Sequence, residues 1–229
     1  MVKNLKNAFF ALFVFSVLLF SSCAEQGPSG PAGAPGVGLV STSFQDGAYP
    51  AAAYAGTRNA RLTHLSPDSV STGAFSAGIF GTGNYWRQLL GFDVSYLSGT
   101  GLSVEKAFIT FTTDSVLGTT TITAYALNRN WVEDQVTWNS YSTGNLWTAA
   151  GGDFGEAVST TLEVSAAGTY TLEISAALVQ NWIDKPSDNY GVLIKAANET
   201  VTSNRFHGSV RTDLPVSERP RLTVYYTAP

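Results

Sequence analysis

The sequence has little of what enzymes and disulfide-stabilised folds depend on. One cysteine, Cys23, occurs in 229 residues, so no disulfide can form within the chain. Of the two histidines, neither His64 nor His207 accompanies a nucleophile motif, a glycine-rich phosphate loop or a metal-ligand spacing. Glu133 and Asp134 are adjacent, and adjacent side chains on an extended chain point apart, which makes them a poor acid–base pair. These absences predict a protein that is not an enzyme and needs no cofactor.

Charged residues are also scarce, at 13% of the chain, whereas aromatic residues make up 12%. Together with abundant glycine, serine and threonine, this composition favours an extracellular-type, all-β domain. Without a leader that contains Lys3 and Lys6, 11 basic side chains face 17 acidic ones, a formal charge of −6. An acidic chain gains nothing from phosphate electrostatics, so we expect no nucleic-acid partner.

Residues 1–22 have the pattern of a bacterial signal peptide, because two lysines precede an apolar run, Ala8 to Phe20, that is short for a membrane span. Phe20-Ser21-Ser22-Cys23 then resembles a lipobox, at which the cysteine is acylated and becomes the new N-terminus. We therefore expect a lipid anchor at Cys23. Ala24 does not supply the aspartate that retains lipoproteins at the inner membrane, so the outer membrane or cell surface is expected. The alternative is an ordinary secretory signal with a chance cysteine.

Residues 23–38 form a second segment, in which glycine recurs at every third position from Gly27 to Gly36. This is the collagen period, in which only glycine fits the crowded axis. So few triplets give little to offset the entropy of assembling three chains. The simpler interpretation is a semi-rigid spacer. A trimerising stub, and with it a homo-oligomer, stays open, because a trimeric domain could nucleate it.

From residue 39 to 229 the chain alternates between short strand-like runs and turns. In the run 106–111, Ala107, Ile109 and Phe111 share one face, and the same period of two recurs at 121–127, 169–174 and 221–226. Such short runs indicate a sandwich or barrel. One helix is expected after Ser175, a good N-cap, with Trp182 on its apolar stripe.

Five blocks in this region, in order, resemble the DNRLRE domain, a bacterial and archaeal extracellular module with members classed as carbohydrate-binding module family 96. The resemblance covers about residues 40 to 226. Gly91 departs from the family pattern, which often has a basic residue there, and the alanine-rich 48–60 replaces a polar loop. The matching blocks are 86–95, 104–111, 127–141, 179–194 and 219–226.

The resemblance implies an antiparallel, jelly-roll-like β-sandwich that binds polysaccharide, with an acidic one such as alginate as the suggested class. A sugar site needs an exposed aromatic ring with polar neighbours. Trp147 and Tyr141, with Asn139 nearby, are the candidates, because the loop 141–155 is rich in glycine, serine and threonine. The alternative for each aromatic is packing within the core or anchoring of the loop.

An acidic polysaccharide would also need basic side chains. Arg205, Arg219 and Arg221 occur late in the chain and would share a face if their strands were neighbours. Ordinary surface ion pairing is the alternative. A structural calcium site is compatible with such a sandwich, although no spacing selects among the aspartates that lie near turns. These are Asp46, Asp93, Asp153 and Asp188.

Two hypotheses follow for the whole protein. The first is a lipid-anchored, non-catalytic surface module that binds polysaccharide or matrix glycans. The second is a structural surface, adhesin or filament subunit, in which the sandwich assembles through protein–protein contacts. A polar groove favours the first, and an apolar patch or an open sheet edge favours the second.

Overall fold

A computed structural model describes residues 38–79, 83–199 and 215–229, together with the backbone of residues 205–209. Residues Val37–Pro229 form one compact unit. Cys23 and the glycine–proline segment that follows it lie outside the described residues, so their roles stay predictions.

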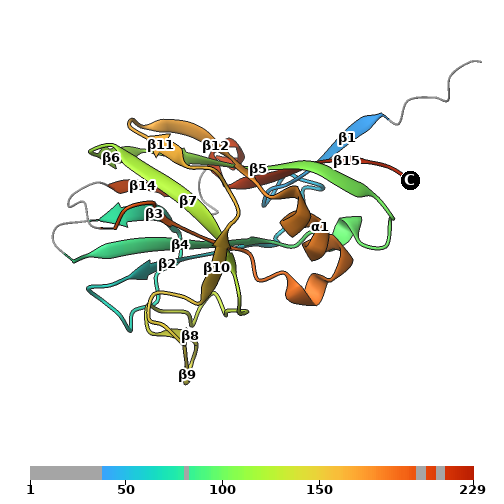
Figure 1. Ribbon diagram of the computed structural model, residues 1–229. Coiled ribbons are helices and arrows are strands. Elements are labelled where there is room, and N and C mark those ends of the chain that lie inside the picture. Colours follow the sequence, from blue (N-terminus) through green and yellow to red (C-terminus); the bar gives the residue numbers. More distant parts are fainter. Residues whose placement is uncertain (1–37, 80–82, 200–204, 210–214) are drawn as a thin grey trace, which may run out of the picture. The chain divides into compact units, whose positions relative to one another are not determined.

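Two antiparallel sheets carry the fold (Figure 1). The smaller sheet has four strands in the order β1-β15-β5-β12. Strands β1 and β15 lie side by side at the right of Figure 1. The four strands are β1 (Leu39–Phe44), β5 (Ser103–Thr113), β12 (Gly168–Ile174) and β15 (Arg221–Thr227).

The larger sheet has nine strands, with the main order β10-β7-β13-β4-β3-β14-β6, while β11 pairs with β7 and β2 with β4. Its strands are β2 (Thr57–Thr63), β3 (Ala74–Ile79), β4 (Tyr85–Phe92), β6 (Ser115–Leu117), β7 (Thr120–Leu127), β10 (Phe154–Ala157), β11 (Leu162–Val164), β13 (Val192–Ala196) and β14 (Arg205–Ser209). The remaining short elements are β8 (Ser140–Ser142), β9 (Asn145–Leu146), η1 (Ser95–Leu97), η2 (Pro186–Asp188) and η3 (Val216–Glu218).

The main core lies between the two sheets, where alternate side chains of facing strands meet. Ala107, Ile109 and Phe111 of β5 are all buried, as their alternation predicts. Phe111 stacks on Phe75 of β3 with ring centroids 4.6 Å apart, so this pair joins one sheet to the other. The predicted antiparallel β-sandwich is therefore confirmed.

The predicted helix is also confirmed as α1 (Ala176–Asp184). The Ser175 side chain caps it by accepting a hydrogen bond from the backbone N–H of Leu178. Trp182 is buried with its neighbour Ile183 in the main core. The Gln180 side chain also accepts from the backbone N–H of Val104 at 2.8 Å. A helix this short depends on such docking, because it would not persist alone in water.

A second layer, not foreseen from the sequence, covers the outer face of the larger sheet. Residues 128–154, hereafter the cover loop, contain β8 and β9, which are drawn below β2 and β4 in Figure 1. Successive residues of β4 divide between the layers, because Leu90 belongs to the main core and Leu89 to the outer one. The buried outer core consists of Ala60, Leu62, Leu89, Leu127, Trp131, Val136, Trp138, Trp147 and Leu193.

The edge strand β2 is closed by side chains and loops. It pairs with β4 alone among the described strands, so alternate backbone amides point away from the sheet. Three of these amides donate to a side chain or to a loop carbonyl and not to another strand. Their hydrogen bonds block the edge to other chains. The bonds run from Thr57 N to Asp46 Oδ1 at 3.0 Å, from Asn59 N to Glu133 Oε1 at 2.9 Å, and from Arg61 N to Ser71 O at 2.8 Å.

Candidate functional site

The structure favours the second of the two interpretations of Trp147, an anchor of the loop, over an exposed stacking platform. Its side chain is only 5% exposed, and its indole N–H donates to the Thr137 carbonyl at 3.0 Å. The ring of Tyr141 packs against it at 5.7 Å between centroids. Trp147 therefore anchors the cover loop, because a buried indole needs an acceptor and the outer core needs a large apolar side chain.

Tyr141 and Asn139 are engaged with other side chains of the chain. The Arg129 guanidinium lies 4.8 Å from the centroid of the half-buried Tyr141 ring. The Asn139 amide donates to Asp68 Oδ1 at 2.8 Å. The three residues do lie in one loop, as predicted, but they do not present an open aromatic surface.

The late arginines do not share one sheet face. Arg205 belongs to β14 of the larger sheet, whereas Arg221 belongs to β15 of the smaller sheet, opposite Thr110. The side chain of Arg205 lies outside the described part of the structure. Arg219 precedes β15, and its guanidinium donates to the Asp46 carbonyl at 2.9 Å. The predicted basic face fails because β14 and β15 are not neighbours.

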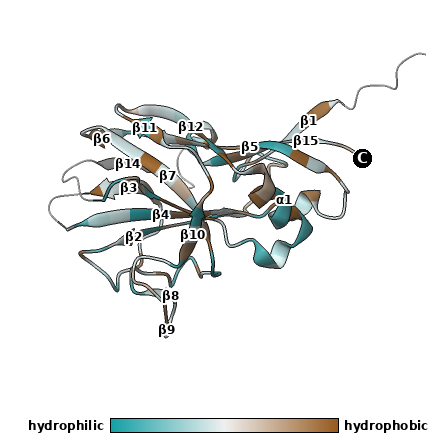
Figure 2. Ribbon diagram, viewed as in Figure 1, coloured by the Kyte–Doolittle hydropathy of each residue, from teal (hydrophilic) through white to brown (hydrophobic). Residues whose placement is uncertain are grey.

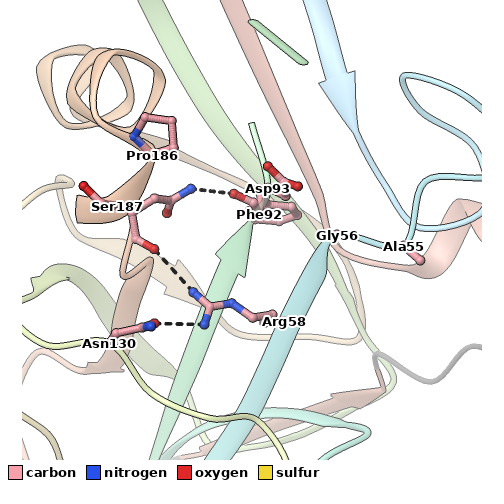
Figure 3. Close-up of a pocket in the computed structure, with 9 residues that line it drawn as sticks. Ala55, Gly56, Arg58, Phe92, Asp93, Asn130, Pro186 and Ser187 are labelled. Atoms are coloured by element: carbon pink, nitrogen blue, oxygen red, sulfur yellow. Dashed lines mark hydrogen bonds between the residues drawn. The ribbon is translucent and has the colours of Figure 1, made fainter. Parts of the chain in front are cut away.

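Two pockets instead flank one turn, Asn128 to Asn130, which follows β7. The first, the Arg58 pocket, has a volume of about 420 Å³ (Figure 3). The second, the Arg129 pocket, has a volume of about 410 Å³. The Arg58 pocket is lined by Ala55, Gly56, Arg58, Phe92, Asp93, Asn130, Pro186, Ser187 and Asn189, and the Arg129 pocket by Asn128, Arg129, Thr148, Ala149, Gly152, Asp153 and Phe154.

Arg58 is fixed from several sides. Its guanidinium donates to Asn130 Oδ1 and the Trp131 carbonyl, both at 3.0 Å, and to the Asn189 carbonyl at 3.3 Å. It also lies 4.9 Å from the centroid of the Trp131 ring. Figure 3 shows its side chain reaching toward Asn130. Burial lowers the pKa of Arg58 below its ordinary value, although nearby carboxylates, Glu133 first, act in the opposite direction.

The rest of the Arg58 pocket comes from the end of β4 and the turn after α1. The exposed Asp93 carboxylate accepts from the Ser95 backbone N–H at 2.9 Å. The Asn189 amide donates to the Phe92 carbonyl at 2.8 Å. Its Oδ1 atom is buried and has no hydrogen-bond partner. Gly91 lies opposite Arg58 in the β2–β4 register, so the guanidinium occupies the space beside the position where the sequence departs from the family pattern.

The Arg129 pocket is built around Asp153. This carboxylate accepts from the backbone N–H groups of Thr148 and Ala149, each at 3.0 Å, and pairs with Arg129 at 3.1 Å. Burial opposes ionisation of Asp153, but the hydrogen bonds from Thr148, Ala149 and Arg129 outweigh it and hold its pKa below the ordinary value. The carboxylate thus fixes the loop that forms the pocket wall.

An ionic cluster holds the cover loop to the sheet. Arg87 of β4 makes a two-pronged contact with Glu199, at 2.9 and 2.8 Å, and donates to the Gly151 carbonyl at 2.8 Å. Its guanidinium lies 4.8 Å from the centroid of the Trp138 ring. Lys195 completes the cluster at 3.3 Å from Glu199. Burial works against ionised Glu199, but Arg87 and Lys195 outweigh it and lower its pKa.

No group of three or more His, Cys, Asp or Glu side chains in the described part of the chain could hold a metal ion. Asp46, Asp93 and Asp153, which lie near turns, accept hydrogen bonds from backbone amides, and Asp188 accepts from the Ser187 hydroxyl. Glu133 accepts from Asn59 at the β2 edge. His64 packs against Tyr85 and Trp138.

Sequence reasoning identified loop residues within 128–154 but not their covering role, and it missed the Arg58 pocket, which joins four separate segments of the chain. The turn residues Asn128 and Asn130 were visible as a break in the strand pattern, and they are the signal that could have located both pockets. Within the described residues, no helix is both long and apolar enough to span a membrane.

Comparison of the chain with protein-family models gives no match, and comparison with curated proteins gives none either. The resemblance to the DNRLRE domain therefore stays a prediction that rests on the five sequence blocks.

Proposed function

We propose that this protein is a lipid-anchored, non-catalytic module of the bacterial cell surface that binds polysaccharide. The observation that carries the proposal is the pair of pockets on either side of Asn128 to Asn130, each of which has polar side chains in its lining. A polymer binds through several neighbouring subsites, whereas a small metabolite needs only one. Two pockets that share one turn provide two neighbouring subsites. Their amide, hydroxyl and guanidinium groups are the kinds that bind sugar hydroxyls.

The pockets are also preorganised. Arg58 and Arg129 are each stacked on an aromatic ring and bonded to acceptors, so neither side chain must be ordered when a ligand arrives. This rigidity favours binding, since immobilising a long side chain costs about 0.5–1.5 kcal/mol. The sheet and the outer core hold both pockets in place from below.

Retention in polysaccharide affinity gels tests the proposal. The double variant Asn128→Ala/Asn130→Ala removes two exposed amides that line the pockets, and we expect it to lose most of the wild-type retention. Leu65→Ala is the matched control, because Leu65 is 66% exposed and lies in neither pocket. Absence of wild-type retention across a broad panel of polysaccharides would contradict the proposal.

The anchor is tested separately. Cells that express the full chain and are fed a labelled fatty acid should incorporate the label, and Cys23→Ser should abolish incorporation. Incorporation that persists in Cys23→Ser, or none in the wild type, would contradict a lipid anchor at this residue.

A second candidate, assembly with other copies through β1, is favoured by one observation. Strand β1 pairs with β15 on one side only, and no described strand or side chain closes its other edge as the edge of β2 is closed. Its first residues Leu39 and Val40 are 56% and 46% exposed, and they form the brown start of β1 in Figure 2. An open, uncharged edge is a template for strand pairing.

Sedimentation equilibrium of the chain from residue 38 decides this second candidate. Assembly predicts a defined oligomer for the wild type and dissociation by Val40→Lys, because a lysine on an edge opposes pairing. Leu65→Lys, at an exposed site elsewhere, is the control and should not change the mass. A strict monomer at high concentration would exclude assembly through this edge.

A further inference from the structure

The charges within the two pockets indicate which class of polysaccharide binds there, an inference that rests on the proposed function. The ionisable side chains that line the Arg58 pocket are Arg58 and Asp93. Those that line the Arg129 pocket are Arg129 and Asp153. Each pocket therefore combines one positive with one negative group, and neither offers a net positive charge. We infer that the ligand is an uncharged polysaccharide, bound through its hydroxyls, and not an acidic one.

Both guanidinium groups already have an acceptor within the protein and lie against an aromatic ring. Arg58 already donates to three oxygen acceptors, and its face is covered by Trp131. Arg129 is paired with Asp153, and its face is covered by Tyr141. A uronate carboxylate bound at either guanidinium would stand beside Asp93 or Asp153. Like charges at such short range disfavour the complex.

The uncharged groups of the pockets suit hydroxyls better than carboxylates. Asn128, Asn130 and Asn189 carry amides that both donate and accept hydrogen bonds, and Ser187 and Thr148 carry hydroxyls that do the same. An ionised carboxylate only accepts hydrogen bonds and can use only the donors of these groups, whereas a sugar hydroxyl can use both their donors and their acceptors.

The other arginines whose side chains the structure describes lie outside both pockets. Arg61 is stacked on Trp86, and Arg87 is bound to Glu199. Arg219 and Arg221 belong to the smaller sheet side of the molecule and lie in neither pocket. Outside the leader, the 17 acidic residues outnumber the 11 basic ones, so an acidic polymer is also repelled at long range.

The inference is tested by affinity electrophoresis of the purified chain in gels that contain single polysaccharides. The neutral probes are mixed-linkage β-glucan, xyloglucan, mannan and xylan, and the acidic probes are alginate and polygalacturonate. We expect retention by at least one neutral probe, unchanged between about 0.05 M and about 0.5 M NaCl because no ion pair with the ligand is screened. Asn130→Ala should weaken this retention roughly fivefold or more, the loss expected for one or two hydrogen bonds.

A charge-changing variant tests the physical reason. Asp93→Asn keeps an oxygen that can accept from the Ser95 backbone N–H but removes the negative charge from the Arg58 pocket, so we expect it to gain salt-sensitive retention by alginate. Glu163→Gln, an exposed substitution on β11 outside both pockets, is the control for the change in net charge.

The outcomes separate the two proposals. Retention of the wild type by alginate or polygalacturonate alone, lost at high salt, would overturn the inference and leave polysaccharide binding in place. Retention by neutral and acidic probes alike would also overturn it. Absence of retention by every probe would overturn both.

Discussion

The two faces of the nine-stranded sheet are covered in different ways. The inner face meets the smaller sheet through a core of hydrocarbon side chains, to which Leu90 of β4 and Phe111 of β5 both belong. The outer face meets the cover loop through tryptophans whose rings carry arginines, Arg58 on Trp131 and Arg87 on Trp138. The fold therefore depends on the inner layer, and the pockets depend on the outer layer. The inner core consists of apolar side chains, whereas charged side chains take part in the packing of the outer layer.

The largest effect is expected in the inner core. Phe111→Ala removes the ring that stacks on Phe75 and leaves a cavity between the sheets, so it should lower the free energy of unfolding by about 3–5 kcal/mol. Urea denaturation measures this loss. Phe108→Ala, on the opposite face of the same strand, is the control and should cost clearly less. Equal losses for the two variants would contradict the assignment of the faces.

The next effect concerns the ionic cluster. Arg87→Ala leaves Glu199 with Lys195 alone and frees the Gly151 carbonyl, so we expect a loss of about 2–3 kcal/mol. Amide hydrogen exchange should accelerate in the cover loop, 128–154, more than in β5. Arg87→Lys keeps the charge but loses the two-pronged contact, and should give an intermediate loss. Uniform acceleration across both layers would show that the outer layer does not open separately.

The third prediction concerns the hydrogen bond that Glu133 makes at the edge of β2. Glu133→Ala removes the acceptor for the backbone N–H of Asn59 and should cost about 1–2 kcal/mol in urea denaturation. Glu133→Gln retains a carbonyl oxygen at the same reach and should cost less. Burial raises the pKa of Glu133, against the hydrogen bond from Asn59 and the charge of Arg58, so loss of its charge alone is not the expected cause of instability. A glutamine variant as unstable as the alanine variant would contradict the capping role.

The smallest effect is the dependence on pH. Glu199 and Asp153 have lowered pKa values in the folded protein, so their stabilisation is present above the ordinary values of 4.5 and 3.8 and is lost as pH falls through the folded values. Glu133 acts in the opposite sense, because its raised pKa makes the protein gain stability from it as pH falls. Urea midpoints between about pH 6 and about pH 3 should therefore fall, and less steeply in Glu199→Gln. A Glu199→Gln profile as steep as the wild type would contradict this assignment.

The inner layer could be predicted from the sequence, because its signals are local. The alternation of Ala107, Ile109 and Phe111 identifies a buried strand face, and Ser175 before an apolar stripe identifies the helix. Both patterns involve neighbours a few residues apart, where backbone geometry fixes which side chains share a face.

The outer layer could not be predicted in the same way. Arg87 and Glu199 are 112 residues apart, and their contact depends on how β4 and β13 pair. Trp147 was expected to be exposed because it lies in a loop rich in small polar residues, yet such a loop can itself cover a sheet. The density of tryptophan between 131 and 147 is the sequence signal of that covering role.

The most direct test of polysaccharide binding at the paired pockets is amide chemical-shift mapping with a soluble neutral oligosaccharide that the affinity gels identify. The account predicts that the shifts cluster at 128–130, at 148–154 and at 186–189, with few changes on the four-stranded sheet. Shifts confined to β1, β15 or β5, or the absence of any shift at a saturating concentration, would contradict it.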